Sequence, residues 1–139
     1  IFLPEALAAA LPAGVEGNVV NLLDQSVWKP TPRHFSYQLA KVALWEATRM
    51  LAQSLAPRVR VNGIAPGPTL PHSAQSEAEF AARLDTVLLK RGPELTEFGS
   101  TVRYFVENRS VTGQMIGLDG GQHLAWETPD VAELDIQDP

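Results

Sequence analysis

The 139-residue chain has the composition of one ordinary globular domain, with 45% hydrophobic and 19% charged residues. Its formal net charge of -5 and its scattered Lys and Arg residues argue against nucleic acid as a partner, because phosphate binding needs a basic patch. The absence of cysteine excludes disulfides and thiolate metal sites and suits a reducing compartment, so we expect a cytoplasmic protein.

The first predicted elements are a short helix and a strand. Residues 1–15 form a strongly apolar stretch, but it is shorter than the roughly 18 residues of a membrane helix, and Pro4 and Pro12 interrupt it. We therefore predict a helix that starts near Pro4 and ends before Pro12, and no membrane contact. The β-branched and apolar run Gly17–Leu23 predicts a strand buried on both faces, followed by a loop over 24–32.

A long helix and a second strand follow. Residues 34–56 contain no Gly or Pro, and apolar residues recur among them at helical spacing, which predicts a helix. A second face of this helix carries Ala40, Ala43 and Ala47, small side chains that allow another helix to approach closely. Val59–Ala65 predicts the next strand, and the Pro-Gly-Pro sequence after it predicts a sharp turn.

The rest of the chain predicts two more helices and a last strand. Helical spacing covers Glu77–Lys90 and again Glu97–Asn108, where Thr96 is the expected N-cap. Gln114–Leu118 predicts the strand. The face of the second helix that we expect to be buried carries Phe98, Val102, Phe105 and Val106.

This alternation of helices and strands predicts an α/β fold, a parallel sheet with helices on both faces. Ligands bind such sheets beyond the carboxyl ends of the strands. Asp24 follows the first predicted strand and Pro66–Leu70 follows the second, so we expect both on one rim, at a site for a small molecule.

Tyr37 and Lys41 are the first candidates for chemistry at this rim. Four residues apart on a helix, they lie on one face. A nearby ammonium favours the phenolate and lowers the phenol pKa from about 10, and such a Tyr can deliver a proton to a developing anion. The same spacing also occurs on many helices without any catalytic role.

Four segments in order resemble the C-terminal part of the short-chain dehydrogenase/reductase family, and most closely its pteridine reductase and dihydromonapterin reductase-like branch. The resemblance implies the C-terminal half of one doubly wound Rossmann-type domain over 1–125, an acidic tail over 126–139, and a homo-oligomer, either dimer or tetramer. The segments are Gly17–Leu23, the helix with Tyr37-x-x-x-Lys41, Ala56–Gly67, and Val111–Gln114 with Asp119-Gly120-Gly121.

The resemblance also implies roles for individual residues. Tyr37 would be the proton donor, and Lys41 would bind the nicotinamide ribose and lower the Tyr37 pKa. Leu23 would pack against the nicotinamide ring. The turn that lines this ring would consist of Pro66, Gly67, Pro68 and Thr69. The cofactor would be NADPH, with NADH as an alternative.

Asp24 departs from the family pattern, which has a Ser thirteen residues before the Tyr. An ionised carboxylate only accepts hydrogen bonds, so Asp24 would face a donor on the substrate, as the N-H groups of a pterin provide. We therefore expect reduction of a pterin-like C=N bond. Alternatively, Asp24 caps the loop and is incidental to a carbonyl reductase acting on a 3-oxoacyl group or a ketone, with Ser26 or Ser36 as the hydroxyl donor.

The Gly-rich phosphate loop of the family would precede residue 1, so we expect this chain alone to be inactive, and a non-enzymatic fragment with oligomer contacts is a third hypothesis. Trp28 and Phe35 either stack on a flat substrate or pack in the fold. The three His residues are too dispersed for a metal site.

Overall fold

A parallel sheet of three strands forms the centre of the computed structural model, which describes residues 2–73 and 75–126. The strands are β1 (Gly17–Leu22), β2 (Val59–Pro66) and β3 (Met115–Leu118), in the order β1-β2-β3. All neighbouring strands pair in parallel, so their carboxyl ends meet at one edge of the sheet. This arrangement confirms the predicted α/β fold class.

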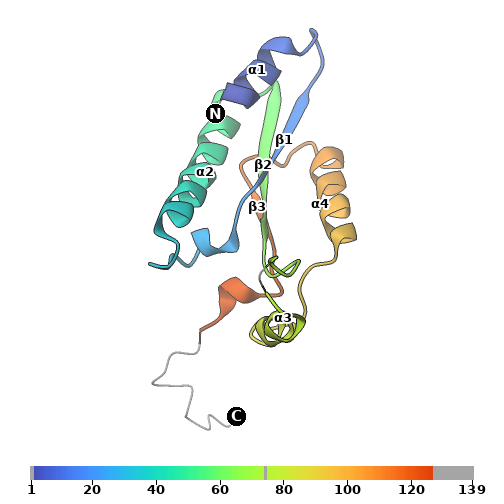
Figure 1. Ribbon diagram of the computed structural model, residues 1–139. Helices are drawn as coiled ribbons and strands as arrows, with labels where there is room; N and C mark the ends of the chain where they lie inside the picture. Colours follow the sequence, from blue (N-terminus) through green and yellow to red (C-terminus); the bar gives the residue numbers. More distant parts are fainter. Residues whose placement is uncertain (1, 74, 127–139) are drawn as a thin grey trace, which may run out of the picture.

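Three of the four helices in the described residues cover the faces of the sheet (Figure 1). Helices α1 (Phe2–Ala10) and α2 (Phe35–Ser54) lie on one face, and α4 (Leu95–Glu107) lies on the other. Helix α3 (Glu77–Leu84) lies beyond the carboxyl ends of the strands. The helices on both faces follow from the topology, because each crossover between parallel strands must pass over one face of the sheet.

The core lies on both sides of β2, whose residues are mostly buried. On the side of α2, Leu51 and Ala52 pack with Val59 and Val61 in one apolar cluster. On the side of α4, Phe105 is completely buried. Burial of an aromatic or aliphatic side chain of this size contributes about 1.5–3 kcal/mol to folding, so these contacts fix the two helix layers on the sheet.

Two polar side chains of β2 attach the end of α4 and the start of β3 to the sheet. Arg60 donates hydrogen bonds to four carbonyl groups at and after the end of α4, those of Phe105, Val106, Asn108 and Val111. The fully buried Asn62 donates to Val111 O at 3.1 Å and accepts from Gln114 N at 3.0 Å. These groups satisfy carbonyls that the helix end leaves unpaired.

The helix predicted over Glu77–Lys90 is shorter in the structure and ends at Leu84. Ser76 and Glu79 form a capping box at its start. Beyond its end, Val87 is 1% exposed and packs against Gly120, and Leu89 N donates to Gly120 O at 3.0 Å. The chain leaves the helix because this tertiary contact draws it towards the end of β3.

Three expectations about α4 and β1 are wrong. The N-cap of α4 is Glu94, not Thr96, and the Glu97 carboxylate accepts from Glu94 N at 2.6 Å. The predicted burial of Phe105 is confirmed, but Val102 and Val106 are 40% and 54% exposed, because Thr101 and not these valines joins Phe105 on the buried face of α4. Strand β1 is only partly buried, because it lies at the edge of the sheet.

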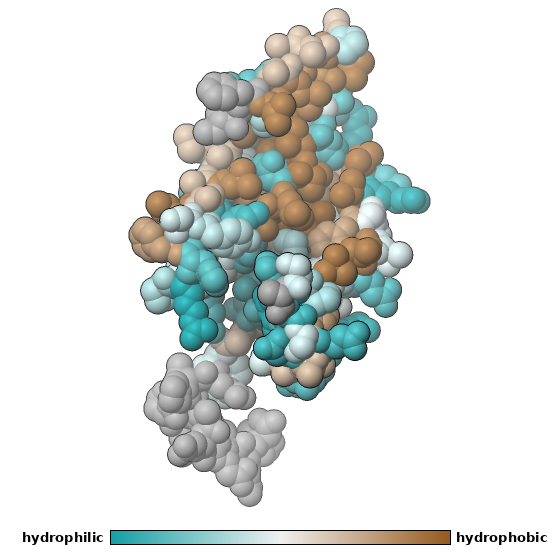
Figure 2. Space-filling view, in the orientation of Figure 1, coloured by the Kyte–Doolittle hydropathy of each residue, from teal (hydrophilic) through white to brown (hydrophobic). Residues whose placement is uncertain are grey.

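An apolar surface extends over the front of the molecule, where β1 lies (Figures 1 and 2). The outer edge of β1 pairs with no strand in the described part of the chain. Beside it, α1, α2 and β1 enclose a groove of about 480 Å³ whose lining includes Leu7, Val19 and Leu44.

Within the described residues, every helix is too short or too polar to cross a lipid bilayer.

Gly67 is required by the close approach of β2 and β3 at their carboxyl ends. A Cβ atom added there would lie 2.6 Å from the Cα of Asp119, so we expect Gly67→Ala to lower the free energy of unfolding by about 1–3 kcal/mol. The matched control is Gly99→Ala on α4, where an added Cβ meets no atom within 4 Å and should stabilise the helix by about 0.5–1 kcal/mol. Urea unfolding of both variants tests this, and equal effects would contradict it.

Candidate active site

The site residues predicted from the sequence gather at the carboxyl edge of the sheet. Asp24 follows β1, and the turn 66–69 follows β2. The turn is held to the end of β3 by a hydrogen bond from Gly67 N to Leu118 O of 2.9 Å. The expected common rim is therefore present, and the parallel register produces it.

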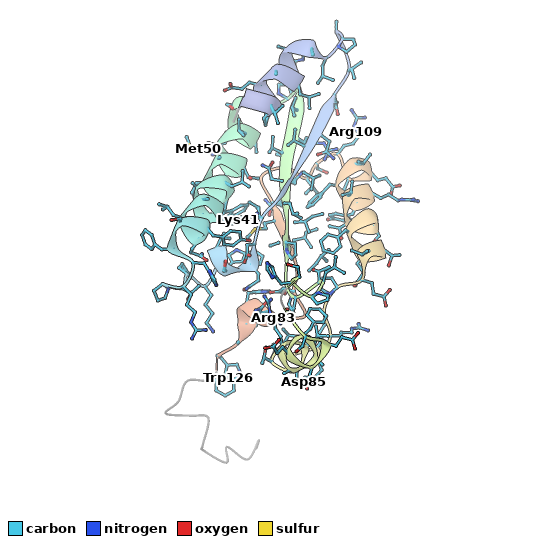
Figure 3. The ribbon with its side chains drawn as sticks, viewed as in Figure 1. Lys41, Met50, Arg83, Asp85, Arg109 and Trp126 are labelled. Carbon is cyan, nitrogen blue, oxygen red and sulfur yellow. The ribbon has the colours of Figure 1, made fainter. Side chains whose placement is uncertain are left out.

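The start of α2 contacts the end of β1 and the loop after it through three side chains. Tyr37 Oη donates to Asp24 Oδ2 at 2.8 Å. Gln38 Nε2 donates to the carbonyl of Ser26 at 2.9 Å, and Lys41 Nζ donates to the carbonyl of Leu22 at 2.8 Å. Figure 3 labels Lys41 where it reaches from α2 towards this strand. Tyr37, Lys41 and Asp24 are thus brought together as the sequence predicts.

The pKa of Tyr37 is raised to about 12, which reverses the expectation that Lys41 lowers it. Burial of the hydroxyl is the largest cause, and the hydrogen bond to Asp24 and the charge of Asp24 add to it. Lys41 Nζ lies 5.5 Å from the centre of the Tyr37 ring and donates to the Leu22 carbonyl instead. At neutral pH Tyr37 therefore holds its proton and can act as an acid.

Asp24 has two roles at once in this geometry. Its Oδ1 accepts from Ser26 N at 2.8 Å and caps the short helix η1 (Gln25–Val27). Its Oδ2 accepts from Tyr37. Asp24 thus caps the loop, as one interpretation of the sequence expects, and also accepts from Tyr37, because each carboxylate oxygen makes one of these contacts and retains a further lone pair for a ligand donor.

The residues expected around a nicotinamide differ in exposure. Leu23 is 2% exposed, and its side chain lies against Gly63 of β2, where an added Cβ would come within 2.3 Å of it. Leu22, the residue before Leu23, is exposed. In the turn, Pro68 is buried and Thr69 is partly exposed, with its hydroxyl donating to Gly67 O at 3.1 Å.

An open cleft of about 620 Å³ lies next to Asp24 and Tyr37. Its lining also includes Ser26, whose buried hydroxyl has no hydrogen-bond partner in the described residues, and two side chains that the sequence did not single out, Arg33 and Arg83. Only the fold identifies these two arginines as cleft residues, because they come from separate segments of the chain. Gln38 was also not predicted as a site residue, although its place between Tyr37 and Lys41 on one helix could have indicated a role at the site.

The Asp119-Gly120-Gly121 turn forms a second, structural cluster behind the rim. Asp119 is 2% exposed and accepts from Gly121 N, from His123 N and from the His123 ring at 2.6 Å. The ring of Trp28 packs on His123 at 4.7 Å, so Trp28 packs in the fold, and neither it nor Phe35 lines the cleft. Among the described residues, no group of His, Cys, Asp and Glu could hold a metal.

A family model described as enoyl-(acyl carrier protein) reductase matches residues 2–123. Among curated proteins, dihydromonapterin reductase of Klebsiella pneumoniae subsp. pneumoniae is 33% identical over 127 residues, which cover 87% of this chain and 53% of that protein. The chain spans about half the length of the curated relatives it matches.

Two solved structures have a similar fold and sequence. One is FolM alternative dihydrofolate reductase 1 from Brucella canis in complex with NADP, with a TM-score of 0.91 and 63% identity over 94% of this chain and 52% of that one. The other is its counterpart from Brucella suis, also with NADP, with a TM-score of 0.92 and 62% identity over 94% of this chain and 53% of that one.

Replacing the Asp24 carboxylate should lower the Tyr37 pKa. The carboxylate accepts a hydrogen bond only from the protonated phenol and repels the phenolate, so in Asp24→Asn the pKa should fall below 12. It should stay above about 10, because burial still raises it. Titration of tyrosinate absorbance measures this shift, with Tyr37→Phe to identify the signal against Tyr104. An unchanged pKa would show that Asp24 does not hold the proton.

Proposed function

Because the chain belongs to the short-chain dehydrogenase/reductase family, we propose that it forms the proton-donating and substrate-binding half of an NADPH-dependent reductase of pterin-like substrates. The observation that carries the proposal is the hydrogen bond between Tyr37 and Asp24 at the carboxyl edge of the sheet. It joins a protonated phenol to a carboxylate that faces an open cleft.

Tyr37 supplies the proton in this proposal. Its pKa of about 12 keeps the hydroxyl protonated at neutral pH, as a general acid requires. Tyr37 lines the open cleft, so a bound substrate can reach it. A developing anion on a substrate nitrogen or oxygen then takes the proton.

Asp24 recognises the substrate. A pterin ring presents amino and ring N-H donors, which match the acceptor capacity left on the carboxylate. When such a donor binds the free lone pair of Oδ2, the substrate lies beside the Tyr37 hydroxyl, which can then turn from Asp24 towards the developing anion. A ketone offers no donor and would meet an unfavourable carboxylate, so this geometry favours the C=N substrate over the carbonyl substrate.

The donors at the rim fit the nicotinamide end of the cofactor. When bound, NADPH supplies the hydride that the substrate carbon accepts. Lys41 Nζ uses one of its three N-H groups on Leu22 O and keeps two for ribose hydroxyls. Thr69 and the backbone of the turn that includes Pro66, Gly67 and Pro68 would bind the carboxamide. Both similar Brucella structures contain NADP, which supports NADPH as the cofactor.

The other half of the cofactor site requires a further segment of polypeptide. The chain covers only about half of its relatives, and the unpaired outer edge of β1 lies beside an apolar groove. An unpaired edge in such surroundings is a template for strand addition. We propose that the dinucleotide-binding half pairs there, which would complete the sheet and place the cofactor across the rim.

In the protein that includes this second half, Tyr37→Phe should reduce kcat by about 10²–10⁴-fold, because it removes the general acid. The dissociation constant of NADPH should change little, because the aromatic ring and Lys41 remain. Tyr104→Phe on α4 is the matched control and should keep full turnover, since Tyr104 lies outside the cleft. Steady-state kinetics and a fluorescence titration measure both effects. Normal turnover by Tyr37→Phe would exclude it as proton donor.

Asp24→Ser distinguishes the pterin substrate from the carbonyl alternative. If Asp24 binds N-H donors of a pterin, the variant should lose pterin reduction and gain reduction of a ketone or 3-oxoacyl substrate, because a hydroxyl can donate to a carbonyl. Rates of NADPH oxidation with each substrate measure the change. Unaltered pterin reduction in the variant would support the view that Asp24 only caps the loop.

A further inference from the structure

The cleft beside Asp24 and Tyr37 is lined by basic side chains. Arg33 comes from the loop before α2, and Arg83 comes from the last turn of α3. Among the described residues that line the cleft, Asp24 is the only carboxylate. The chain as a whole has a net charge of -5, so this local excess of positive charge runs against its overall composition.

The described part of the chain offers no partner to the side chain of either arginine. The guanidinium groups of Arg33 and Arg83 form no hydrogen bond or ion pair with any residue in the ranges 2–73 and 75–126. By contrast, Arg60 binds carbonyl groups at the end of α4, and Arg109 pairs with Glu16. The two cleft arginines therefore keep all their donors for a ligand.

The backbone of both arginines is nevertheless held in place. Arg33 N donates to Thr31 Oγ1 at 3.3 Å, and Thr86 Oγ1 donates to Arg83 O at 2.7 Å. The capping box at Ser76 fixes the start of α3, the helix that carries Arg83 (Figure 3). Two separate segments of the described chain thus each bring to the cleft an arginine whose guanidinium group has no partner among the described residues.

We infer that Arg33 and Arg83 bind a carboxylate on the side chain of the substrate and so select dihydrofolate over dihydromonapterin. This inference rests on the proposed pterin reductase function. With the pterin ring at Asp24, the ring substituent extends along the cleft. In dihydrofolate this substituent ends in the two carboxylates of glutamate, whereas in dihydromonapterin it is a short neutral chain of hydroxyls. Guanidinium groups bind carboxylates in a planar, bidentate geometry.

A cofactor phosphate is the competing ligand for these cations. The cleft includes Asp24 and Tyr37 in its lining, but it includes neither Lys41 nor any residue of the turn 66–69, which are the groups expected to bind the nicotinamide end. The arginines therefore lie on the substrate side of Tyr37. A substrate carboxylate is the ligand that this position favours.

The test compares two substrates with the complete enzyme. In the double variant Arg33→Gln/Arg83→Gln, the ratio of kcat/KM for dihydrofolate to kcat/KM for dihydromonapterin should fall about tenfold. The fall should come mainly from a higher KM for dihydrofolate. A change of this size is expected when two partly exposed charge pairs are lost. In the unmodified enzyme the same ratio should fall as salt rises. Arg103→Gln is the matched control, because Arg103 is an exposed arginine on α4 outside the cleft.

Each outcome decides between the two levels of the proposal. An unchanged substrate ratio, or an effect on the KM of NADPH alone, would overturn the carboxylate site while leaving the pterin reductase function intact. If the unmodified enzyme reduces neither pterin, both proposals fail together. A fall in the ratio in the double variant but not in Arg103→Gln supports the carboxylate site.

Discussion

The attachment of α2 to the carboxyl end of β1 determines the geometry of the whole site. Within little more than one helical turn, Tyr37, Gln38 and Lys41 bind three successive points of the segment from Leu22 to Ser26. This attachment orients the helix, shapes the loop, and places the phenol opposite a carboxylate. The position of the phenol thus depends on Gln38 and Lys41, whose side chains bind backbone carbonyl groups, and not on the Tyr37 side chain alone.

The central strand β2 gives this arrangement its rigidity. Its apolar residues hold helices on both faces, while Arg60 and Asn62 satisfy carbonyl and amide groups that the end of α4 and the start of β3 would otherwise leave unpaired. Buried polar networks of this kind stabilise one arrangement because each partner is costly to leave unsatisfied. The rim therefore has a defined form, with Gly67 packed against Asp119.

The electrostatics of the site separate into two regions. Around Tyr37, burial and the Asp24 charge favour the protonated phenol. In the same cleft, Arg33 and Arg83 provide positive charge that has no partner among the described residues. A site that holds both an acceptor and cations discriminates between ligands by the charge of their groups. Discrimination by charge of this kind depends on polar groups that a mismatched ligand leaves unpaired.

The sequence by itself determined the elements and their order, because helix and strand periodicity are local properties of the chain. The three strands were predicted to within one residue, and Tyr37, Lys41 and Asp24 were expected as site residues, which the structure places near one another. Only the tertiary structure decided where α3 ends, which face of α4 is buried, and which way the Tyr37 pKa shifts. Those outcomes, and the cationic cleft of Arg33 and Arg83, depend on contacts between segments far apart in sequence, and no local pattern encodes them.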